Sequence, residues 1–503
     1  LALQLGQGSV GVLRYRNPDN TVQVSKLAFG LRGDGVGYHL DAATAETPWG
    51  RLSGTLQLGA QAPFALRGQV ALQGRQPPPL AVRATLAGTL AEIDVAAGAT
   101  LGQIEASASA VATPFDKTPW KRAELTARRV DPAQWRKGLA RGDFTLALAL
   151  QMQADGSLRG TLEASNAMPG SLDRDRWPLR KLGAEIGGEL ADLRLHGIVL
   201  DLGAAGRFSG SGSVRGSAVA LALATGDFDL KGVHGKLKPT RLSGSIRLGL
   251  EGAVQTLQAD LQQQRYRIHL NAVHRDGSVE VQTASVAAAG SELSFSGAVA
   301  LSGARDFRAA GNLRRFDPAQ FGDFPPALIN AAFSATGRLA PEPQAALKLT
   351  VADSRFRGQA LSGTGQLQLS SRRVWGSDVA LTLGASRFGA RGAFGAPGDR
   401  LDWNIAVADL AVIGPDFAGH GTASGTLEGT PGSPSGTFSA SARQLRWGAD
   451  DRLASLRASG TLAQGLDGML ALSAELAGYR HGKFALDHAS VTARGRRASH
   501  ELS

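Results

Sequence analysis

Hydrophobic and polar residues alternate along most of this chain with a period of two. In a β-strand every second side chain lies on the same face, so the alternation predicts strands with one apolar face. The clearest example is the segment 144–153, where Phe, Leu and Met alternate with Thr, Ala and Gln. Asp155-Gly156 follows it, and Asp-Gly is a strong signal for a hairpin turn. The chain therefore reads as antiparallel hairpins in series.

The same alternation recurs in the segments 242–251, 293–301, 361–369 and 379–383. An apolar sheet face must be covered, and the sequence offers no amphipathic helices to cover it. We therefore expect the apolar stripes to share one face of a single sheet and to line a groove. The predicted lining residues are Leu146, Leu148, Leu150, Met152, Leu242, Ile246, Leu248, Leu250, Leu293, Phe295, Val299, Leu301, Leu367, Leu369, Leu381 and Leu383.

A short motif, Gly-Thr-Leu, occurs at 54–56, 88–90, 160–162, 425–427 and 460–462. Its Gly and Leu share a strand face, and Gly inside a strand marks a bend or a close backbone approach. Some copies will arise by chance in a chain with 65 glycines. Taken as a repeated bend, the motif predicts an all-β fold. It is a long continuous antiparallel sheet, curled into an elongated taco-like trough with an apolar interior and few short helices.

Two short helices are expected, and their sequences mirror each other. The segment Arg128–Trp135 matches Arg314–Phe321, and both contain Asp-Pro-Ala-Gln. Asp is a good N-cap and Pro is favoured in the first helical turn. The match suggests an internal repeat near residues 131 and 317. Because composition does not shift along the chain, residues 1–503 are predicted to form a single continuous segment with no separate domains.

Charge and composition narrow the choice of partners. The chain has no Cys and a net charge of +11. Its basic residues are scattered and no basic cluster is interleaved with aromatic residues, so a nucleic-acid partner is not expected. Diffuse basicity suits anionic lipid headgroups. The purest apolar run covers residues 218–224 and is too short for a membrane-spanning helix.

Several motifs with possible chemistry lack the required context. Gly6–Gly11 fits GxGxxG but is not followed by a helical pattern, and residues 232–236 lack the flanks of a phosphate-binding loop. The pairs His269/His274 and His481/His488 complete no recognised zinc spacing. Distant carboxylates of the kind that hydrolyse glycosides stay open. We expect no catalytic residues, no cofactor and no metal, and therefore no enzyme.

Several phrases resemble the TamB branch of the AsmA-like family. They are residues 315–321, 324–330 and 335–339, together with 169–174 and 177–179. The resemblance implies a long β-structure in the periplasm of a Gram-negative cell. In such proteins an N-terminal helix anchors the chain in the inner membrane. We expect the present chain to be the middle of such a protein, without that anchor and without the region that faces the outer membrane.

The resemblance implies a non-enzymatic bridge that carries phospholipids along an apolar groove between the inner and outer membranes. Phospholipid acyl chains are then the expected ligand. An alternative is a scaffold for outer-membrane protein assembly with a TamA-type barrel partner. A third possibility is an enzyme or adhesin on a parallel β-helix, but the hairpin spacing and the Asp-Gly turns are typical of antiparallel strands.

Overall fold

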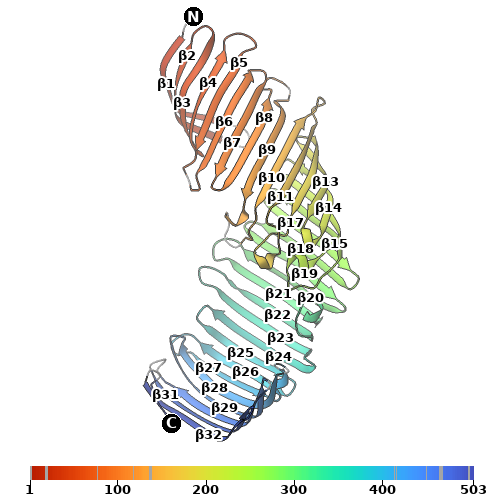
Figure 1. The fold of residues 1–503 in the computed structure, drawn as a ribbon, viewed down its shortest axis with the longest axis vertical. Helices are drawn as coiled ribbons and strands as arrows, with labels where there is room; N and C mark the ends of the chain where they lie inside the picture. The colour runs from red at the N-terminus through yellow and green to blue at the C-terminus, as the bar shows by residue number, and fades with distance from the viewer. Residues whose placement is uncertain are drawn as a thin grey trace. The chain divides into compact units, whose positions relative to one another are not determined.

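The computed structural model describes residues 3–16, 21–75, 77–116, 118–134, 139–412, 414, 416–448, 450–463, 468–496 and 499–503. Its 33 strands are assigned to one antiparallel sheet. By internal contacts the chain divides into two compact units, Leu1–Gly252 and Ala253–Ser503. Each unit is described by itself below, with the strand labels of Figure 1.

The first unit contains the strands β1 to β16, which pair with their neighbours in the sequence from β1–β2 through to β15–β16. Their bounds are β1 Leu3–Arg16, β2 Thr21–Gly33, β3 Gly37–Thr47, β4 Gly50–Gly59, β5 Ala65–Gln73, β6 Leu80–Thr89, β7 Ile93–Leu101, β8 Ile104–Ala112, β9 Trp120–Val130, β10 Phe144–Met152, β11 Leu158–Asn166, β12 Lys181–Glu189, β13 Asp192–Asp201, β14 Arg207–Arg215, β15 Ala218–Phe228 and β16 Leu242–Glu251.

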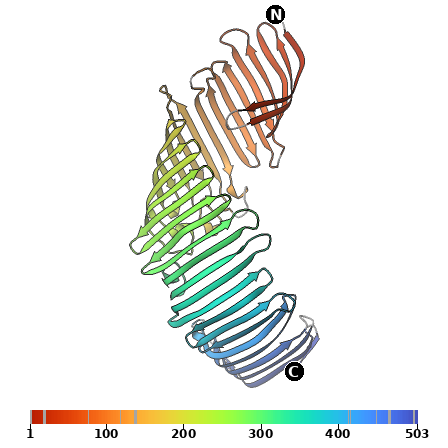
Figure 2. The ribbon, with the colours of Figure 1, turned by 180° about the vertical axis from the view of Figure 1, so that it is seen from behind.

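The second unit contains β17 to β33, which follow one another as hairpins in the same way (Figure 2). Their bounds are β17 Val254–Gln263, β18 Tyr266–Arg275, β19 Ser278–Ala288, β20 Ser291–Ala300, β21 Asp306–Phe316, β22 Ala327–Arg338, β23 Gln344–Phe356, β24 Gln359–Ser370, β25 Val374–Leu383, β26 Ser386–Phe394, β27 Arg400–Val407, β28 Phe417–Thr430, β29 Ser433–Trp447, β30 Asp451–Leu462, β31 Met469–His481, β32 Phe484–Arg496 and β33 Ser499–Leu502.

The short helices lie on one edge of the sheet within each unit. Every helix of the described residues occurs in a connection from an odd-numbered strand to the next even-numbered strand. Because successive strands run in opposite directions, all such connections emerge at the same edge, which we call the helix-bearing edge. The helices are η1 Pro132–Gln134, η2 Leu172–Arg174, η3 Gly203–Ala205, α1 Leu230–Val233, η4 Pro318–Gln320 and η5 Leu410–Val412.

The two mirrored segments fold in the same way. The Asp131 carboxylate accepts from the Ala133 and Gly142 N–H groups, both at 3.1 Å. Its counterpart Asp317 accepts from Ala319 and Ala327, again both at 3.1 Å. Each Asp thus caps a short helix and also ties it to the end of the connection. Trp135 lies outside the described residues, and the organisation of residues 1–503 as one continuous segment stays a prediction.

Sequence reasoning missed further turns of this kind. Asp229 accepts from Lys231 N–H at 2.9 Å and from Thr240 N–H at 2.8 Å, and it caps α1. Asp409 accepts from Ala411 N–H at 2.9 Å before η5. The turns at positions 131, 229, 317 and 409 are nearly evenly spaced. Neither of the additional Asp residues is followed by Pro, so the Asp-Pro phrase did not identify them.

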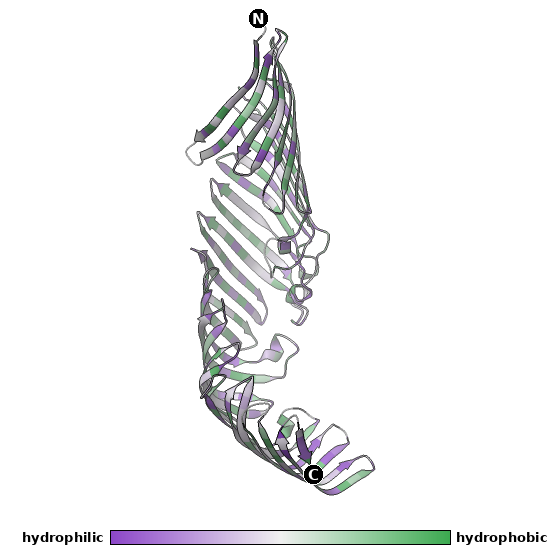
Figure 3. Ribbon diagram, turned by 90° about the vertical axis from the view of Figure 1, so that its left-hand side faces the viewer, coloured by the Kyte–Doolittle hydropathy of each residue, from purple (hydrophilic) through white to green (hydrophobic). Residues whose placement is uncertain are grey.

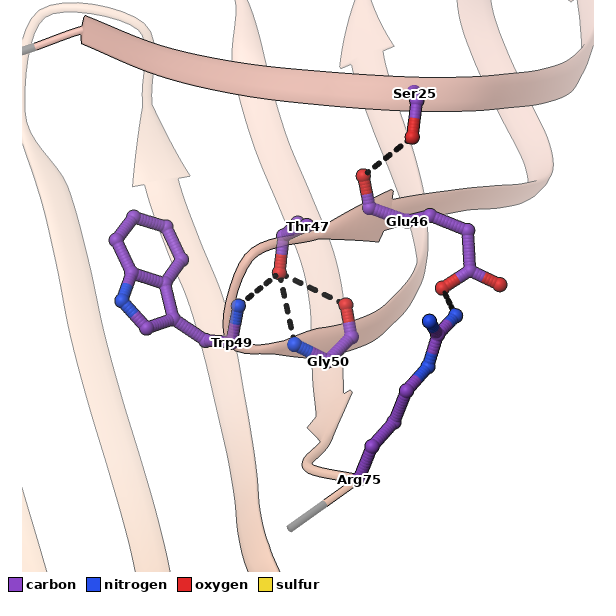
Figure 4. Close-up of polar contacts among 6 residues, drawn as sticks. All are labelled: Ser25, Glu46, Thr47, Trp49, Gly50 and Arg75. Atoms are coloured by element: carbon purple, nitrogen blue, oxygen red, sulfur yellow. Dashed lines mark hydrogen bonds and ion pairs between the residues drawn. The ribbon is translucent and has the colours of Figure 1, made fainter.

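Some connections on the helix-bearing edge are tight turns without a helix. In the β3–β4 turn, Thr47 Oγ1 accepts from the N–H groups of Trp49 at 3.3 Å and Gly50 at 3.2 Å (Figure 4). The hydroxyl donates in turn to the Gly50 carbonyl at 2.8 Å. Gly50 has φ +151° and lies against the backbone of Gln73, where a Cβ would collide. Only glycine fits this turn without strain.

β-Bulges bend the strands. The strand register shifts beside Lys26, Arg129, Arg315, Asp353 and Gln444, whose φ angles are positive. A bulge adds one unpaired residue and increases the local twist, so a sheet with many bulges curls. The positive-φ residues are mostly charged or amide residues with no turn signal around them, and the bulges were not predicted.

The result in each unit is an open, curled trough, which confirms the predicted fold class. In the first unit Leu27 of β2 and Leu86 of β6 line one hollow of about 230 Å³, although three strands separate β2 from β6. In the second unit β27 to β33 curve into a half-open cup (Figures 1 and 3). Among the described residues, the largest fully buried side chains are Phe208, Leu158, Leu242 and Thr113, so few large side chains are fully buried.

Replacing Gly425 with Ala tests the close approach of neighbouring strands. A Cβ at this position would collide with the Thr437 carbonyl and lie 2.9 Å from Cζ2 of Trp403. We expect a loss of about 1–3 kcal/mol in the free energy of unfolding, measured by urea denaturation. The control is Gly365→Ala, whose Cβ would be in ordinary contact at 3.6 Å from Val379. Equal effects of both changes would contradict this account.

Replacing Asp317 with Ala should loosen its turn. The N–H groups of Ala319 and Ala327 lose their acceptor, at a cost of about 1 kcal/mol. Hydrogen exchange at these two amides should therefore accelerate about fivefold. Asp317→Asn keeps a side-chain oxygen and serves as the control. If exchange at both amides is unchanged by the Ala substitution, the carboxylate does not hold the turn.

Candidate functional site

One unbroken row of apolar residues crosses every strand of the first unit. Residues directly opposite each other in an antiparallel ladder project from the same face, so the strand register traces the row. We call it the first apolar row, and no member is polar or charged. It runs Leu5, Leu31, Leu40, Leu56, Gly68, Leu86, Val95, Ala110, Ala123, Leu150, Gly160, Ile186, Leu195, Gly212, Leu221 and Leu248.

The second unit contains an equivalent row through all of its strands, the second apolar row. It runs Ala259, Leu270, Ala284, Phe295, Gly311, Phe333, Leu349, Gly365, Val379, Ala390, Trp403, Gly425, Phe438, Gly460, Leu472, Ala493 and Leu502. Glycine often stands between two large side chains in this row. A Cβ on Gly311 would lie 2.7 Å from the ring of Phe333 and 2.8 Å from Cβ of Phe295, so the large neighbours fill the space above the glycine.

The opposite face is polar in both units. Shifting the first row by one residue gives a line that includes Arg32, Arg67, Asp94, Arg122 and Arg159. The corresponding line in the second unit consists mainly of Ser, Thr and Asn, for example Ser424, Ser439 and Ser459. Figure 3 shows the alternation as green and purple bands along single strands. The sheet therefore has one apolar and one hydrophilic face.

Among the described residues, protein does not cover the large side chains of the apolar rows. Every Leu, Ile, Val, Phe and Trp of both rows is half-buried or exposed. Leu248 is 38% exposed and Phe295 36%, although each lies opposite an apolar residue of a neighbouring strand. Side chains in a filled sandwich core would be buried. The half-buried state is what an open trough produces, because neighbours on the same face shield only the flanks of each side chain.

The structure places the sixteen predicted lining residues consistently. Fifteen lie in strands on the face of the apolar rows, and Leu301 follows the end of β20. Leu146, Leu248 and Phe295 are exposed, and twelve others are half-buried. Leu242 differs because its exposed fraction is 0%, so its side chain is covered by protein. Contact of these residues with lipid stays a prediction.

Sequence reasoning missed several large members of the rows. Leu195, Leu221, Phe333, Trp403 and Phe438 all stand in strands with the same alternation. The strands of Leu221 and Phe333 are rich in Ala and Gly, so their apolar stripes are thinner. The alternation of apolar and polar residues is present in these strands. Their place in the rows becomes clear only when the strand register shows which residues lie opposite one another.

Polar groups with possible chemistry are dispersed. His269 Nδ1 lies 2.7 Å from Asp260 Oδ1, and His481 Nδ1 lies 2.9 Å from Asp451. No group of three or more His, Asp or Glu side chains is arranged for a metal ion in the described part of the chain. The GxGxxG match at Gly6–Gly11 lies inside β1, whereas dinucleotide binding needs a strand–turn–helix. None of the described helices is long and apolar enough to span a membrane.

These observations define an open, one-sided β-trough protein with an uncovered apolar face. The family model described as TamB, N-terminal domain, matches residues 245–503, which is more than half of the chain. The chain therefore belongs to the TamB family, as its sequence phrases suggested. A comparison with curated proteins gives no match.

Placing charges on the first apolar row should remove its affinity for apolar probes. Replacing Leu150 and Leu221 with Glu introduces two carboxylates that resist desolvation by an apolar ligand. The fluorescence of bound Nile red should fall. Replacing their neighbours on the polar face, Gln151 and Ala220, with Glu adds the same charge and should leave the fluorescence unchanged. A loss in both variants would mean that charge alone, rather than the row, determines binding.

Proposed function

We propose that this protein is a non-enzymatic carrier that holds the acyl chains of phospholipids along its apolar rows. The single observation that supports this is the continuity of the rows through every strand of each unit. A site for one small ligand would need a closed pocket with a few placed polar groups. An uninterrupted apolar strip instead suits a long, featureless chain.

An acyl chain on such a row would be held by apolar contacts and could still move from strand to strand. Burying one methylene group stabilises the bound state by about 0.8 kcal/mol, so an acyl chain needs no specific contacts to be held. Equivalent positions recur at every strand, about 4.8 Å apart. Moving by one strand replaces one set of apolar contacts by a similar set. The free energy therefore changes little along the row, and the chain can slide.

Membership of the TamB family supports placing this activity in the envelope of a Gram-negative cell. We propose that the protein acts in the periplasm as part of a bridge between the inner and outer membranes. An inner-membrane anchor and a TamA-type barrel at the outer membrane would be the attachments at its two ends. Transport of phospholipid, rather than of another amphiphile, belongs to the same proposal.

The second candidate function is a scaffold for assembly of outer-membrane proteins with the TamA-type barrel. Family membership favours it as much as the lipid bridge. The two differ in what touches the apolar face: acyl chains in one case, and strands of a client protein in the other. A probe placed on the face can therefore separate them.

A photo-crosslinking amino acid at Leu248 supplies this test. Leu248 is exposed on the first apolar row, and Arg247 is exposed on the opposite face and serves as the matched control. After irradiation in cells, mass spectrometry should find phospholipid attached at position 248 and little at position 247. Arg or Glu at Leu148 and Leu248 should reduce lipid passage while circular dichroism stays that of a β-sheet.

Crosslinks from position 248 only to proteins would contradict the lipid proposal and favour the scaffold. Equal lipid labelling from both positions would indicate nonspecific association with membranes, and would also contradict it.

A further inference from the structure

Four connections on the helix-bearing edge of the first unit form a ledge. They join β9 to β10, β11 to β12, β13 to β14 and β15 to β16, and they carry η1, η2, η3 and α1. We define the ledge as residues 131–134, 139–143, 167–180, 202–206 and 229–241, all of which the structure describes. On the opposite edge the same strands are joined by short turns at 153–157, 190–191 and 216–217.

Hydrogen bonds between the connections make the ledge one packed body. Trp177 Nε1 donates to the Ala140 carbonyl at 2.7 Å, which joins the first two connections. Asp229 N–H donates to the Ala205 carbonyl at 3.0 Å, which joins the last two. Gly235 N–H donates to Asp173 Oδ1 at 3.1 Å and links the second connection to the fourth. Side chains from separate connections are thereby held near one another.

The ledge carries an excess of positive charge. It has eight Lys or Arg residues and five Asp residues. The carboxylates of Asp131, Asp173 and Asp229 accept from backbone N–H groups of the ledge itself, and Asp175 pairs with Arg141. The Gly235 N–H bond holds the pKa of Asp173 below its usual value. These carboxylates are committed to holding the fold.

Part of the basic charge has no partner. Arg174, Lys231 and Lys236 are exposed and form no ion pair with another described residue. Arg176 is half-buried, and its Nη1 atom is buried with no hydrogen-bond partner. A buried guanidinium nitrogen without an acceptor is costly, so a shift of the Arg176 side chain that brings Nη1 to an acceptor of a ligand would stabilise it. Arg174 and Lys236 adjoin the Asp173–Gly235 contact, so the cluster spans two connections.

Two basic residues near other turns of the first unit form ion pairs. Arg75 forms an ion pair with Glu46 beside the β3–β4 turn (Figure 4). On the opposite edge, Arg215 pairs with Asp192 at 3.1 Å, and the Asp155 carboxylate accepts from Ser157 in its own turn. At these two places the basic side chains have carboxylate partners, whereas several on the ledge do not.

The ledge borders the apolar face. Phe144, Phe208 and Leu242 stand in the first two positions of the strands that leave it, on the face of the first apolar row. All three are buried, and the half-buried row begins beyond them. A ligand that touches both surfaces must join an anionic group to a long apolar chain.

We propose that the ledge binds the phosphate group of a phospholipid whose acyl chains lie on the first apolar row between β10 and β16. Arg174, Arg176, Lys231 and Lys236 supply the donors, and guanidinium and ammonium groups are the common protein partners of phosphate oxygens. This inference rests on the proposed function, because it names the part of the lipid that is recognised. It makes lipid binding directional across the sheet, with headgroups at the helix-bearing edge.

The test compares two lipids with equal acyl chains, of which only one carries phosphate. The purified full chain is incubated with phosphate-free dodecyl maltoside micelles that contain phosphatidylglycerol or diacylglycerol, separated from the micelles, and extracted for bound lipid. The wild type should hold phosphatidylglycerol in preference to diacylglycerol. In the variant R174E/K231E/K236E that preference should fall by about tenfold or more, because the basic residues that attract the anionic headgroup become acidic. The control R122E/R159E/R194E changes the net charge equally on the polar face and should keep the preference.

A crosslinker at Leu248 reports acyl binding separately. If the ledge variant still forms crosslinks to lipid but no longer prefers phosphatidylglycerol to diacylglycerol, the result supports headgroup binding at the ledge. An unchanged preference in the ledge variant would overturn this inference and leave the proposed function standing. No lipid on the wild type, or binding of free glycerol phosphate alone, would overturn both. If the triple variant does not fold, Arg174→Gln with Lys236→Gln removes charge without reversing it, and the same comparison applies.

Discussion

The register of the antiparallel ladder is the constraint on which the structure depends. A shift of one residue in one strand would move that strand's whole apolar stripe to the hydrophilic face. Leu150, Gly160 and Ile186 are an example. Gly160 of β11 lies opposite Leu150 of β10 on one side and opposite Ile186 of β12 on the other, so a shift in any of the three strands would break the row. Each hairpin turn fixes the register of the two strands that it joins. The rows are therefore continuous only because every turn sets the correct register.

Much of the fold could be predicted from the sequence because strand alternation is a local signal. The period of two assigned the correct face to Leu148 and Leu248, and Asp155-Gly156 marked a real turn. The buried state of Leu242 could not be predicted, since it depends on how distant connections pack. The bulges at Arg129 and Asp353 were missed because these residue types carry no preference for positive φ strong enough to be read from the sequence.

The apolar face of the candidate site could be predicted from the sequence, but the ledge that borders this face could not. The stripes indicated where apolar contact is available, yet the ledge consists of four connections separated in sequence by whole strands. The Gly235–Asp173 hydrogen bond brings the connections of Arg174 and Lys236 together. No sequence motif near either residue predicts this proximity. Charge that is scattered in the sequence is thus concentrated by topology, which is why the net charge alone suggested only a diffuse affinity for anions.

Pairing of each strand only with its neighbours in sequence has an evolutionary consequence. Deleting or duplicating one hairpin removes or adds two strands and leaves the direction, face and edge of every other strand unchanged. Such proteins can therefore change in reach by increments of about 10 Å, without redesign of the remainder.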